Sequence, residues 1–336
     1  MTSSAGKRSN AAVSTIGSEV PTMDRLADAL RAELGQAAVR ENQSLARYTA
    51  MRIGGPADLL VVAESVEALQ RTVTLAWAHE VPCRVLGGGS NVLVSDRGVR
   101  GLVALNRAQG ITFSVSHEPA GTGQQHGVRA ESGAFLSTVA RKCVDRGLAG
   151  LEWATGIPGT VGGAVVGNAG AWGGDVASTL IRTTVLEPGG QTADWPVEQL
   201  EYGYRTSLLK QAQARDGQAV VLAAEFALRE EERGTLEAQV AEITSRRKAS
   251  QPAGATCGSV FQNPQGDYAG RLIEAAGLKG RRIGGAEISE VHANFFVNRG
   301  DATAAEVAAL IELAHKEVQA QFGVTLELEI QLVGDW

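Results

Sequence analysis

The 336-residue chain has few residues suited to metal or redox chemistry. Its three cysteines (Cys83, Cys143 and Cys257) are far apart and form no CxxC pair, which argues against a disulfide framework and against a zinc site. Its five histidines form no HExxH motif, so we expect no protein-bound metal. This cysteine usage is typical of a reducing compartment, and we expect the protein to be cytoplasmic.

Long hydrophobic runs and an excess of basic charge are also missing. No apolar run approaches the length of a membrane span, and residues 1–20 are small and polar, unlike a signal peptide; we expect them to form a disordered tail. The formal net charge is −6, with basic residues spread along the chain. A nucleic acid is therefore not expected as a partner, but a small anionic ligand is allowed.

Hydrophobic periodicity predicts alternating strands and helices. Residues 57–63 are typical of a buried strand, 65–80 of an amphipathic helix, and 81–86 of a second strand that runs into glycines. A second amphipathic helix is expected over 133–146, with Leu136, Val139, Cys143 and Val144 inward. Strands are expected at 183–188 and 219–228, a charged helix over 231–248, and a domain boundary near residue 249.

The C-terminal region has the clearest local signals. Thr303 and Glu306 form a capping box, and Gly323 follows the last apolar residue of helical spacing. Residues 324–334 alternate and predict a strand. Its expected apolar face is Val324, Leu326, Leu328, Ile330 and Leu332, and its other face carries Glu327 and Glu329.

Two glycine-rich segments predict a phosphate-bearing ligand. The first, GGGSN, consists of Gly87, Gly88, Gly89, Ser90 and Asn91, and offers bare backbone N–H groups and polar side chains directly after a predicted strand. It is not a GxGxxG motif, and a tight turn is its simplest alternative. The second, residues 156–174, contains eight glycines. Together they favour a dinucleotide such as FAD held between two backbones, whereas a glycine-rich bend between strands is the alternative.

Three polar residues are candidates for chemistry, but none is decisive alone. Ser259 lies in GSVFQNP, where a turn or capping serine is the simpler interpretation. Arg205 lies in YGYRTS and could hold a carboxylate in a bidentate manner, although a surface arginine stacked on tyrosine fits equally well. Glu329 on its own is compatible with a solvent-facing strand residue.

Taken in order, these stretches resemble the UDP-N-acetylenolpyruvoylglucosamine reductase family, flavoenzymes of bacterial cell-wall precursor synthesis. The resemblance spans most of residues 45–334. The matching segments are YTAMRIGGPAD (48–58), LGGGSNVLVSD (86–96), the glycine-rich segment (150–176), YGYRTS (202–207), CGSVFQNP (257–264), LIEAAGLKG (272–280), GGAEISEVHANFFVN (284–298) and LELEIQLVG (326–334).

The resemblance implies an α+β fold with an FAD-binding part of the vanillyl-alcohol-oxidase/PCMH type. Two FAD-binding subdomains would span 21–105 and 106–248, a UDP-sugar-binding domain 249–322, and a C-terminal strand carrying Glu329 residues 323–336. The short separation of Arg205 and Ser259 resembles the second subtype of the family, which lacks an extra tyrosine-bearing loop. We expect a monomer.

The resemblance also implies a two-step reaction with non-covalent FAD. NADPH would reduce the flavin, which would then reduce UDP-N-acetylglucosamine-enolpyruvate to UDP-N-acetylmuramate by hydride transfer to C3. By motif position, Ser259 matches the proton donor to C2, and Arg205 and Glu329 match the pair that stabilises the intermediate. The choice of Glu329 over Glu327 rests on the resemblance alone.

Further site residues follow from the same motifs. The expected FAD contacts are Gly87, Gly88, Gly89, Ser90, Asn91, Ile157, Pro158, Gly159, Gly162, Gly163, Asn168 and Gly170. The expected substrate contacts are Tyr204, Asn263, Trp172, Arg271 and His292. Gln262 and Ser250 stand where the family usually has basic residues, and Arg247, Lys248 and Arg271 are candidates to replace them.

Two other functions remain open from the sequence. One is an oxygen-using flavin oxidase on the same fold; such enzymes often attach FAD covalently through histidine or cysteine, and neither glycine segment contains a histidine. The other is a non-catalytic nucleotide-binding module, which would have no chemical need for Ser259, Arg205 and Glu329 together.

Overall fold

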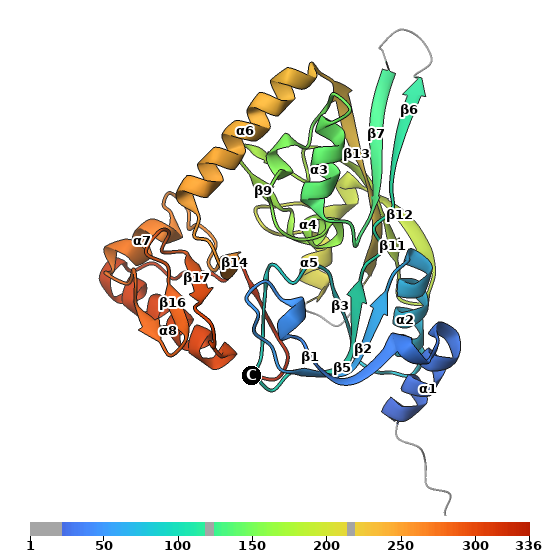
Figure 1. The fold of residues 1–336 in the computed structure, drawn as a ribbon, viewed down its shortest axis with the longest axis horizontal. Coiled ribbons are helices and arrows are strands. Elements are labelled where there is room, and N and C mark those ends of the chain that lie inside the picture. The colour runs from blue at the N-terminus through green and yellow to red at the C-terminus, as the bar shows by residue number, and fades with distance from the viewer. Residues whose placement is uncertain (1–21, 118–123, 214–218) are drawn as a thin grey trace, which may run out of the picture.

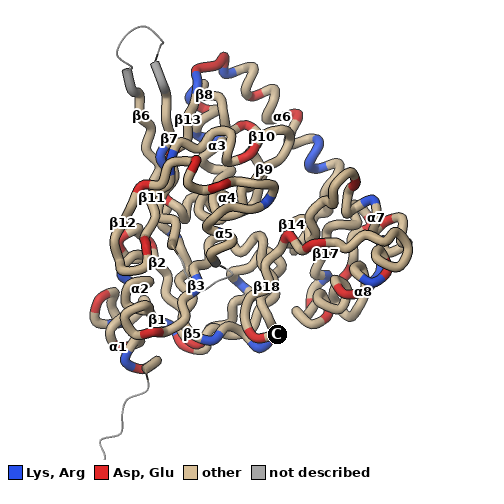
Figure 2. Tube along the Cα trace, turned by 180° about the vertical axis from the view of Figure 1, so that it is seen from behind, with Lys and Arg blue, Asp and Glu red and all other residues tan. Residues whose placement is uncertain are grey.

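The computed structural model describes residues 22–117, 124–213 and 219–336, and the predicted N-terminal tail lies outside them. The elements form three larger sheets with their helices (Figure 1), and two further pairs of short strands lie outside them. None of the helices in the described ranges has the length and hydrophobicity needed to cross a membrane. Lys and Arg alternate with Asp and Glu along the chain trace (Figure 2).

The first sheet has the strand order β1-β2-β5-β3, in which β2 and β3 run parallel to β5. The strands are β1 (Val39–Ser44), β2 (Pro56–Ala63), β3 (Cys83–Leu86) and β5 (Val99–Asn106), and the helices beside them are α1 (Thr22–Leu34) and α2 (Val66–Ala78). Ser65 caps α2 by accepting a hydrogen bond from the Ala68 N–H. Leu69 and Val73 are on the buried face of this helix. The predicted strand–helix–strand unit is confirmed, but β5 lies between its two strands.

The second sheet is antiparallel, with the order β12-β11-β13-β7-β6 and a short β8 on β13. Its strands are β6 (Ile111–His117), β7 (Gln124–Glu131), β8 (Leu148–Ala149), β11 (Leu180–Leu186), β12 (Thr192–Pro196) and β13 (Val220–Glu230). Its helices are α3 (Leu136–Val144), α4 (Val161–Gly167) and α5 (Leu208–Gln213). The predicted inward residues of α3 are buried, so the helix and both predicted strands are confirmed.

A long helix, α6 (Arg233–Ser250), leads from this sheet to the C-terminal part of the chain (Figure 1). There the sheet order is β14-β17-β16-β15, made of β14 (Ala255–Ser259), β15 (Arg282–Ile283), β16 (Ala286–Ile288) and β17 (Phe295–Asn298). Helices α7 (Ala269–Ala275) and α8 (Ala304–Phe322) pack against it. The capping box at Thr303 and the left-handed cap at Gly323 (φ +68°) confirm both predicted ends of α8.

The predicted C-terminal strand over 324–334 is wrong in extent. Only β18 (Gln331–Val333) is a strand, and it pairs in parallel with β4 (Val92–Val94) of the N-terminal part. Before it, the chain bonds instead to the segment after β14: the Gln262 N–H donates to the Glu327 carbonyl, and the Glu329 N–H to the Val260 carbonyl. This change of partner breaks the alternation, so Leu332 is 42% exposed although it was expected to be buried.

The C-terminal part is bonded to loops of the N-terminal part. The Asp96 carboxylate accepts hydrogen bonds from the N–H groups of Ala304 and Ala305 at the start of α8. The Asn298 side chain donates to the Met51 carbonyl at 2.9 Å, and Met51 packs within the C-terminal hydrophobic core. These contacts join the C-terminal part of the chain to the N-terminal part. The division into domains at the residues given above remains a prediction.

Candidate active site

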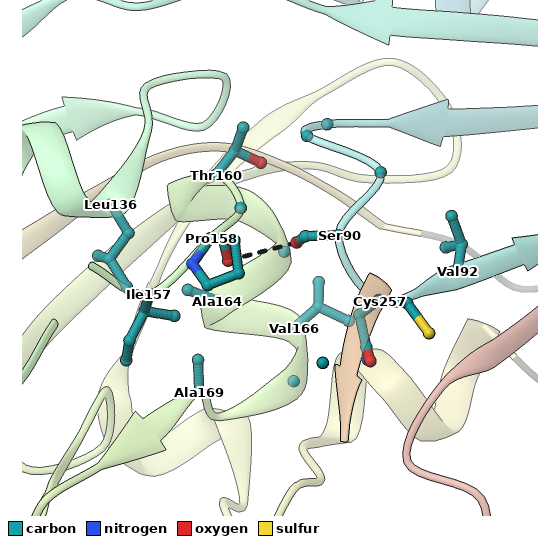
Figure 3. Close-up of a pocket in the computed structure, with 18 of the residues that line it drawn as sticks. Ser90, Val92, Leu136, Ile157, Pro158, Thr160, Ala164, Val166, Ala169 and Cys257 are labelled. Atoms are coloured by element: carbon teal, nitrogen blue, oxygen red, sulfur yellow. Dashed lines mark hydrogen bonds between the residues drawn. The ribbon is translucent and has the colours of Figure 1, made fainter. Parts of the chain in front are cut away.

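A cavity of about 440 Å³ lies where the three sheets meet. Both glycine segments line it, together with Arg205, Lys210, the end of α6, the end of β14 and Glu329. Its volume is within the usual range of small-molecule sites. Figure 3 shows the two glycine segments facing each other, with Val166 and Ala169 of the second segment and Cys257 of β14 also at the cavity.

The two glycine segments contact each other directly. The Ser90 hydroxyl donates to the Pro158 carbonyl at 3.3 Å (Figure 3). A Cβ on Gly88 would lie 3.1 Å from the Cα of Gly159, and a Cβ on Gly159 would lie 2.6 Å from the Ser90 hydroxyl oxygen. These glycines are therefore required by the approach of one backbone to the other, which the sequence analysis, weighing a ligand against a turn or bend, had not anticipated.

Other glycines leave open space beside the cavity. The nearest atom to a Cβ on Gly163 would be the Thr160 hydroxyl oxygen at 3.9 Å, and a Cβ on Gly167 would meet nothing within 4 Å. Both residues are on α4 and line the cavity. A side chain at either position would occupy space that a ligand could use.

Two predicted cofactor contacts have their side chains engaged within the protein. The Asn91 amide donates to the Glu329 carbonyl at 3.1 Å, and the Asn91 carbonyl accepts from the Gln331 N–H at 3.0 Å. Asn168 is buried, ends α4 in the left-handed conformation and does not line the cavity. Its amide donates to the Gly203 carbonyl, and its oxygen accepts from the Ala177 N–H. Both asparagines therefore position neighbouring segments.

Arg205 is held by several internal partners. Its two terminal nitrogens donate to the carbonyls of Asn168 at 3.3 Å and Gly170 at 2.7 Å. Its Nε lies 3.0 Å from Oε1 of Glu329. The surrounding YGYRTS segment is docked on α4, because the Tyr202 hydroxyl donates to the Val165 carbonyl and the Ser207 hydroxyl to the Val166 carbonyl.

The electrostatics of Glu329 combine burial with two nearby cations. Its side chain is 18% exposed, whereas Glu327 is exposed to solvent. Burial raises the pKa of the Glu329 carboxyl, and the positive charges of Arg205 and Lys210 oppose that rise. Burial also lowers the pKa of Lys210, which Glu329 partly counteracts.

Sequence analysis missed Lys210. Lys210 is the third residue after the YGYRTS motif, and it lies on the short helix α5. Nothing in its spacing distinguishes it from a solvated lysine. Its role depends on how α5 packs beside the cavity, which only the fold reveals.

Ser259 ends β14 and lines the same cavity, half-buried. Its hydroxyl makes no hydrogen bond to another residue of the described ranges. It precedes Val260, whose carbonyl accepts the Glu329 N–H at 2.9 Å. The fold therefore brings Ser259, Arg205 and Glu329 to one cavity, from three distant parts of the sequence.

The predicted contacts fall into two groups. The cavity lining includes Gly87, Gly88, Gly89, Ser90, Asn91, Ile157, Pro158, Gly159, Gly162, Gly163 and Gly170. The lining does not include Tyr204, Asn263, Trp172, Arg271 or His292.

The residues outside the lining have other surroundings. The Asn263 oxygen accepts from the Ala269 N–H at the start of α7, and Arg271 pairs with Asp267. His292 accepts a hydrogen bond on Nδ1 from the Asn294 N–H. Tyr204 and Trp172 are exposed, and the Tyr204 ring lies 5.3 Å from the Arg205 guanidinium carbon.

Comparison with known proteins identifies the family. Residues 57–194 match the model of an FAD binding domain, and residues 250–333 match the UDP-N-acetylenolpyruvoylglucosamine reductase C-terminal domain. A reductase of that name from Chloroflexus aggregans is 46% identical over 297 residues, covering 88% of this chain and 97% of the relative. The chain belongs to the UDP-N-acetylenolpyruvoylglucosamine reductase family.

Further members of the reductase family agree. The reductase of Halalkalibacterium halodurans is 43% identical over 316 residues, covering 93% of this chain and 100% of the relative. The crystal structure of the reductase from Thermus caldophilus superimposes with a TM-score of 0.72 at 36% identity, covering 88% of this chain and 99% of that one. The predicted α+β fold with an FAD-binding part and the predicted class, a flavin-dependent oxidoreductase, are confirmed.

The cavity fits a flavin nucleotide. The open positions at Gly163 and Gly167 form a cradle that a Cβ would fill, and bare backbone of the GGGSN loop faces the same space. Backbone N–H groups of such loops suit a diphosphate. The described residues contain no group of three His, Cys, Asp or Glu side chains placed to hold a metal ion.

Proposed function

We propose that the protein catalyses the NADPH-dependent reduction of UDP-N-acetylglucosamine-enolpyruvate to UDP-N-acetylmuramate, a step of peptidoglycan precursor synthesis. The observation that carries the proposal is the meeting of Ser259, Arg205 and Glu329 at one cavity that both glycine segments line. The membership of the chain in the UDP-N-acetylenolpyruvoylglucosamine reductase family supports the same reaction.

Non-covalent FAD would occupy the part of the cavity formed by the two glycine segments. The contacts that we propose for it are Gly87, Gly88, Gly89, Ser90, Ile157, Pro158, Gly159, Gly162, Gly163 and Gly170. Once reduced by NADPH, a bound flavin supplies the hydride for C3 of the enolpyruvyl group. Asn91 and Asn168, which the sequence analysis placed in this set, would act through the segments that their amides hold.

Hydride addition at C3 places negative charge on C2 and on the adjoining carboxylate. Arg205 offers a fixed positive charge for it, because three internal partners leave the guanidinium little freedom to reorganise. Glu329 holds the Nε side of Arg205. Since burial raises the pKa of its carboxyl, Glu329 accepts a proton more readily than an exposed glutamate and can then donate a hydrogen bond to the developing charge.

Ser259 would deliver the proton to C2. Its hydroxyl borders the cavity and is not committed to a hydrogen bond with any other described residue, so it is available to substrate. Proton transfer from a positioned group in this way completes the reduction without exposing the intermediate to bulk solvent.

Arg247 is our candidate for the substrate diphosphate. It lines the cavity from α6 and makes no hydrogen bond or ion pair through its guanidinium within the described ranges. Gln262 donates to the Leu328 carbonyl outside the cavity, and Lys248 and Ser250 are exposed. Burial lowers the pKa of Arg247 below its ordinary value, but the group remains a cation at neutral pH.

The other five substrate contacts expected from the sequence lie outside the cavity lining. Tyr204 and Trp172 are exposed aromatics near the Arg205 segment and stay candidates for contact with the uracil or sugar. Asn263, Arg271 and His292 have partners outside the cavity and rest on the resemblance alone. A monomer and a cytoplasmic location remain predictions; the three free cysteines favour a reducing compartment.

A turnover assay tests this function. NADPH consumption should depend on UDP-N-acetylglucosamine-enolpyruvate, and mass spectrometry should identify UDP-N-acetylmuramate as the product. Oxygen consumption with an alcohol or sugar in the absence of NADPH would instead support an oxidase. NADPH consumption that ignores the enolpyruvyl compound would contradict the proposed substrate.

A further inference from the structure

Lys210 is a charged residue of the cavity to which neither the resemblance nor the proposed reaction gives a role. It is on α5 and lines the cavity beside Arg205 and Glu329, half-buried. A lysine loses side-chain freedom and hydration in such a place, so its retention calls for a compensating interaction.

Its ammonium holds the backbone of Arg205. The Nζ of Lys210 donates to the Arg205 carbonyl at 2.8 Å. Arg205 has a φ of +56°, a left-handed conformation that residues with a Cβ adopt at a cost in free energy. The start of α5 strengthens the arrangement, since the Lys210 N–H donates to the Ser207 hydroxyl at 3.1 Å. The contact fixes the peptide from which the Arg205 side chain extends.

Its charge also acts on Glu329. Arg205 and Lys210 are the two cations that act on this carboxylate, and both favour its ionised form against the effect of burial. The other titratable neighbour is the Cys257 thiol, whose pKa burial raises to about 12, so it is neutral under assay conditions. This corner of the cavity therefore holds two cations and one carboxyl.

We propose that Lys210 is a positioning residue of the reaction: its ammonium fixes the strained Arg205 peptide beside Glu329. The inference rests on the proposed function. Without Lys210, Arg205 loses an anchor beside the substrate. The second half-reaction, in which the enolpyruvyl substrate is reduced, depends on this corner, whereas reduction of the flavin by NADPH does not.

The test compares two uncharged variants, Lys210→Met and Lys210→Gln, with the conservative Lys210→Arg. Lys142→Met is the matched control, because Lys142 is exposed on α3 and away from the cavity. Each holoenzyme is mixed anaerobically first with NADPH and then with the enolpyruvyl substrate, and both rate constants are measured against pH. Calorimetry of substrate binding to the oxidised protein gives a readout independent of turnover.

The two uncharged variants should lose about tenfold or more in the second rate constant, with the first within about twofold of wild type. The inflection of the pH profile that Glu329→Gln removes should move to higher pH, by about one unit, in these variants. Substrate binding should weaken less than the second rate constant falls, and Lys210→Arg should restore most of both effects.

Three results would overturn the inference. The first is wild-type rates and an unshifted inflection of the pH profile in the uncharged variants. The second is an equal loss in both half-reactions that Lys210→Arg does not rescue. The third is failure of both uncharged variants to retain flavin, because Lys210 would then be needed only for the fold. Failure of the proposed function is distinguishable, because then the wild-type reduced protein itself would not react with the enolpyruvyl substrate.

Discussion

The Arg205 guanidinium and the Glu329 carboxylate form an ion pair across the cavity, with Nε and Oε1 3.0 Å apart. Arg205 follows the second sheet's β12, whereas Glu329 lies next to the strand that pairs with β4 of the N-terminal part. The pair therefore exists only in the folded chain. It joins the C-terminal segment to the α4 region, and the predictions below follow from it and from the cavity around it.

Replacing Ser259 should separate the two half-reactions. Ser259→Ala should leave flavin reduction by NADPH near the wild-type rate, because the hydroxyl has no partner within the described ranges whose loss would disturb the fold. Transfer to the enolpyruvyl substrate should slow by about 10²- to 10⁴-fold, the usual contribution of a general acid. Rapid-mixing absorbance at the flavin band measures both steps. A wild-type second rate constant would show that another group provides the proton.

Replacing either member of the ion pair should also affect the second half-reaction. Arg205→Lys loses the fork that the carbonyls of Asn168 and Gly170 hold, and we expect a loss of about 10²- to 10³-fold. Glu329→Gln should be slowed less than Glu329→Ala, because the amide can still donate a hydrogen bond. The same rapid-mixing experiment checks the order. Equal rates for the two Glu329 variants would contradict a hydrogen bond donated by this side chain to the developing charge.

The contribution of Glu329 to the stability of the folded protein should fall as pH rises. Its pKa in the folded protein is raised, so the residue favours the folded state while it is protonated and loses that contribution as pH rises through the folded pKa. The melting temperature of Glu329→Gln relative to wild type should therefore increase as pH rises from the ordinary titration range of a glutamate through the raised pKa of Glu329. Calorimetric melting curves test this. A relative melting temperature that falls over this interval would mean that the two cations outweigh burial.

Replacing Gly163 tests the cofactor cradle. The nearest atom to a Cβ there, apart from the backbone of its own helix, is the Thr160 hydroxyl oxygen at 3.9 Å, and the position lines the cavity, so Gly163→Val should fold but purify without flavin. Gly163→Ala should retain part of it. Gly159→Val is less informative, because its side chain would also collide with Ser90 and disrupt the contact between the two loops. A folded Gly163→Val protein with a full flavin spectrum would place the cofactor elsewhere.

Replacing Arg247 tests the diphosphate contact. Arg247→Ala should weaken substrate binding by about 10- to 100-fold, as expected for the loss of a hydrogen bond to a charged group. Arg246→Ala is the matched control, because Arg246 is the neighbouring residue on α6 but is exposed and paired with Glu242. Isothermal calorimetry of the oxidised proteins compares the two. Equal affinity for both variants would rule out Arg247 as the phosphate ligand.

The sequence predicted individual elements well where periodicity and capping acted locally. The α8 helix is the clearest case, because Thr303, Glu306 and Gly323 define its ends without help from the rest of the chain. The segment before β18 failed because its partners, Val260 and Gln262, belong to a loop far away in the sequence. Alternation of apolar residues does not specify which strand they will meet.

At the candidate active site too, contacts between segments far apart in the sequence were not predicted. The glycine motifs located the cavity, but they did not reveal that Gly88 and Gly159 also approach each other. The amides of Asn91 and Asn168 were expected to face a ligand, and they hold Glu329 and Gly203 instead. Lys210 was missed because its interactions with Arg205 and Glu329 depend on tertiary packing alone.

The most direct test of the account is a visible spectrum of the purified protein under anaerobic conditions. The protein should show a flavin spectrum that bleaches when NADPH is added and recovers only when UDP-N-acetylglucosamine-enolpyruvate follows. This result would establish cofactor, donor and acceptor in one cuvette. A flavin that bleaches but is not reoxidised by the enolpyruvyl substrate would contradict the account.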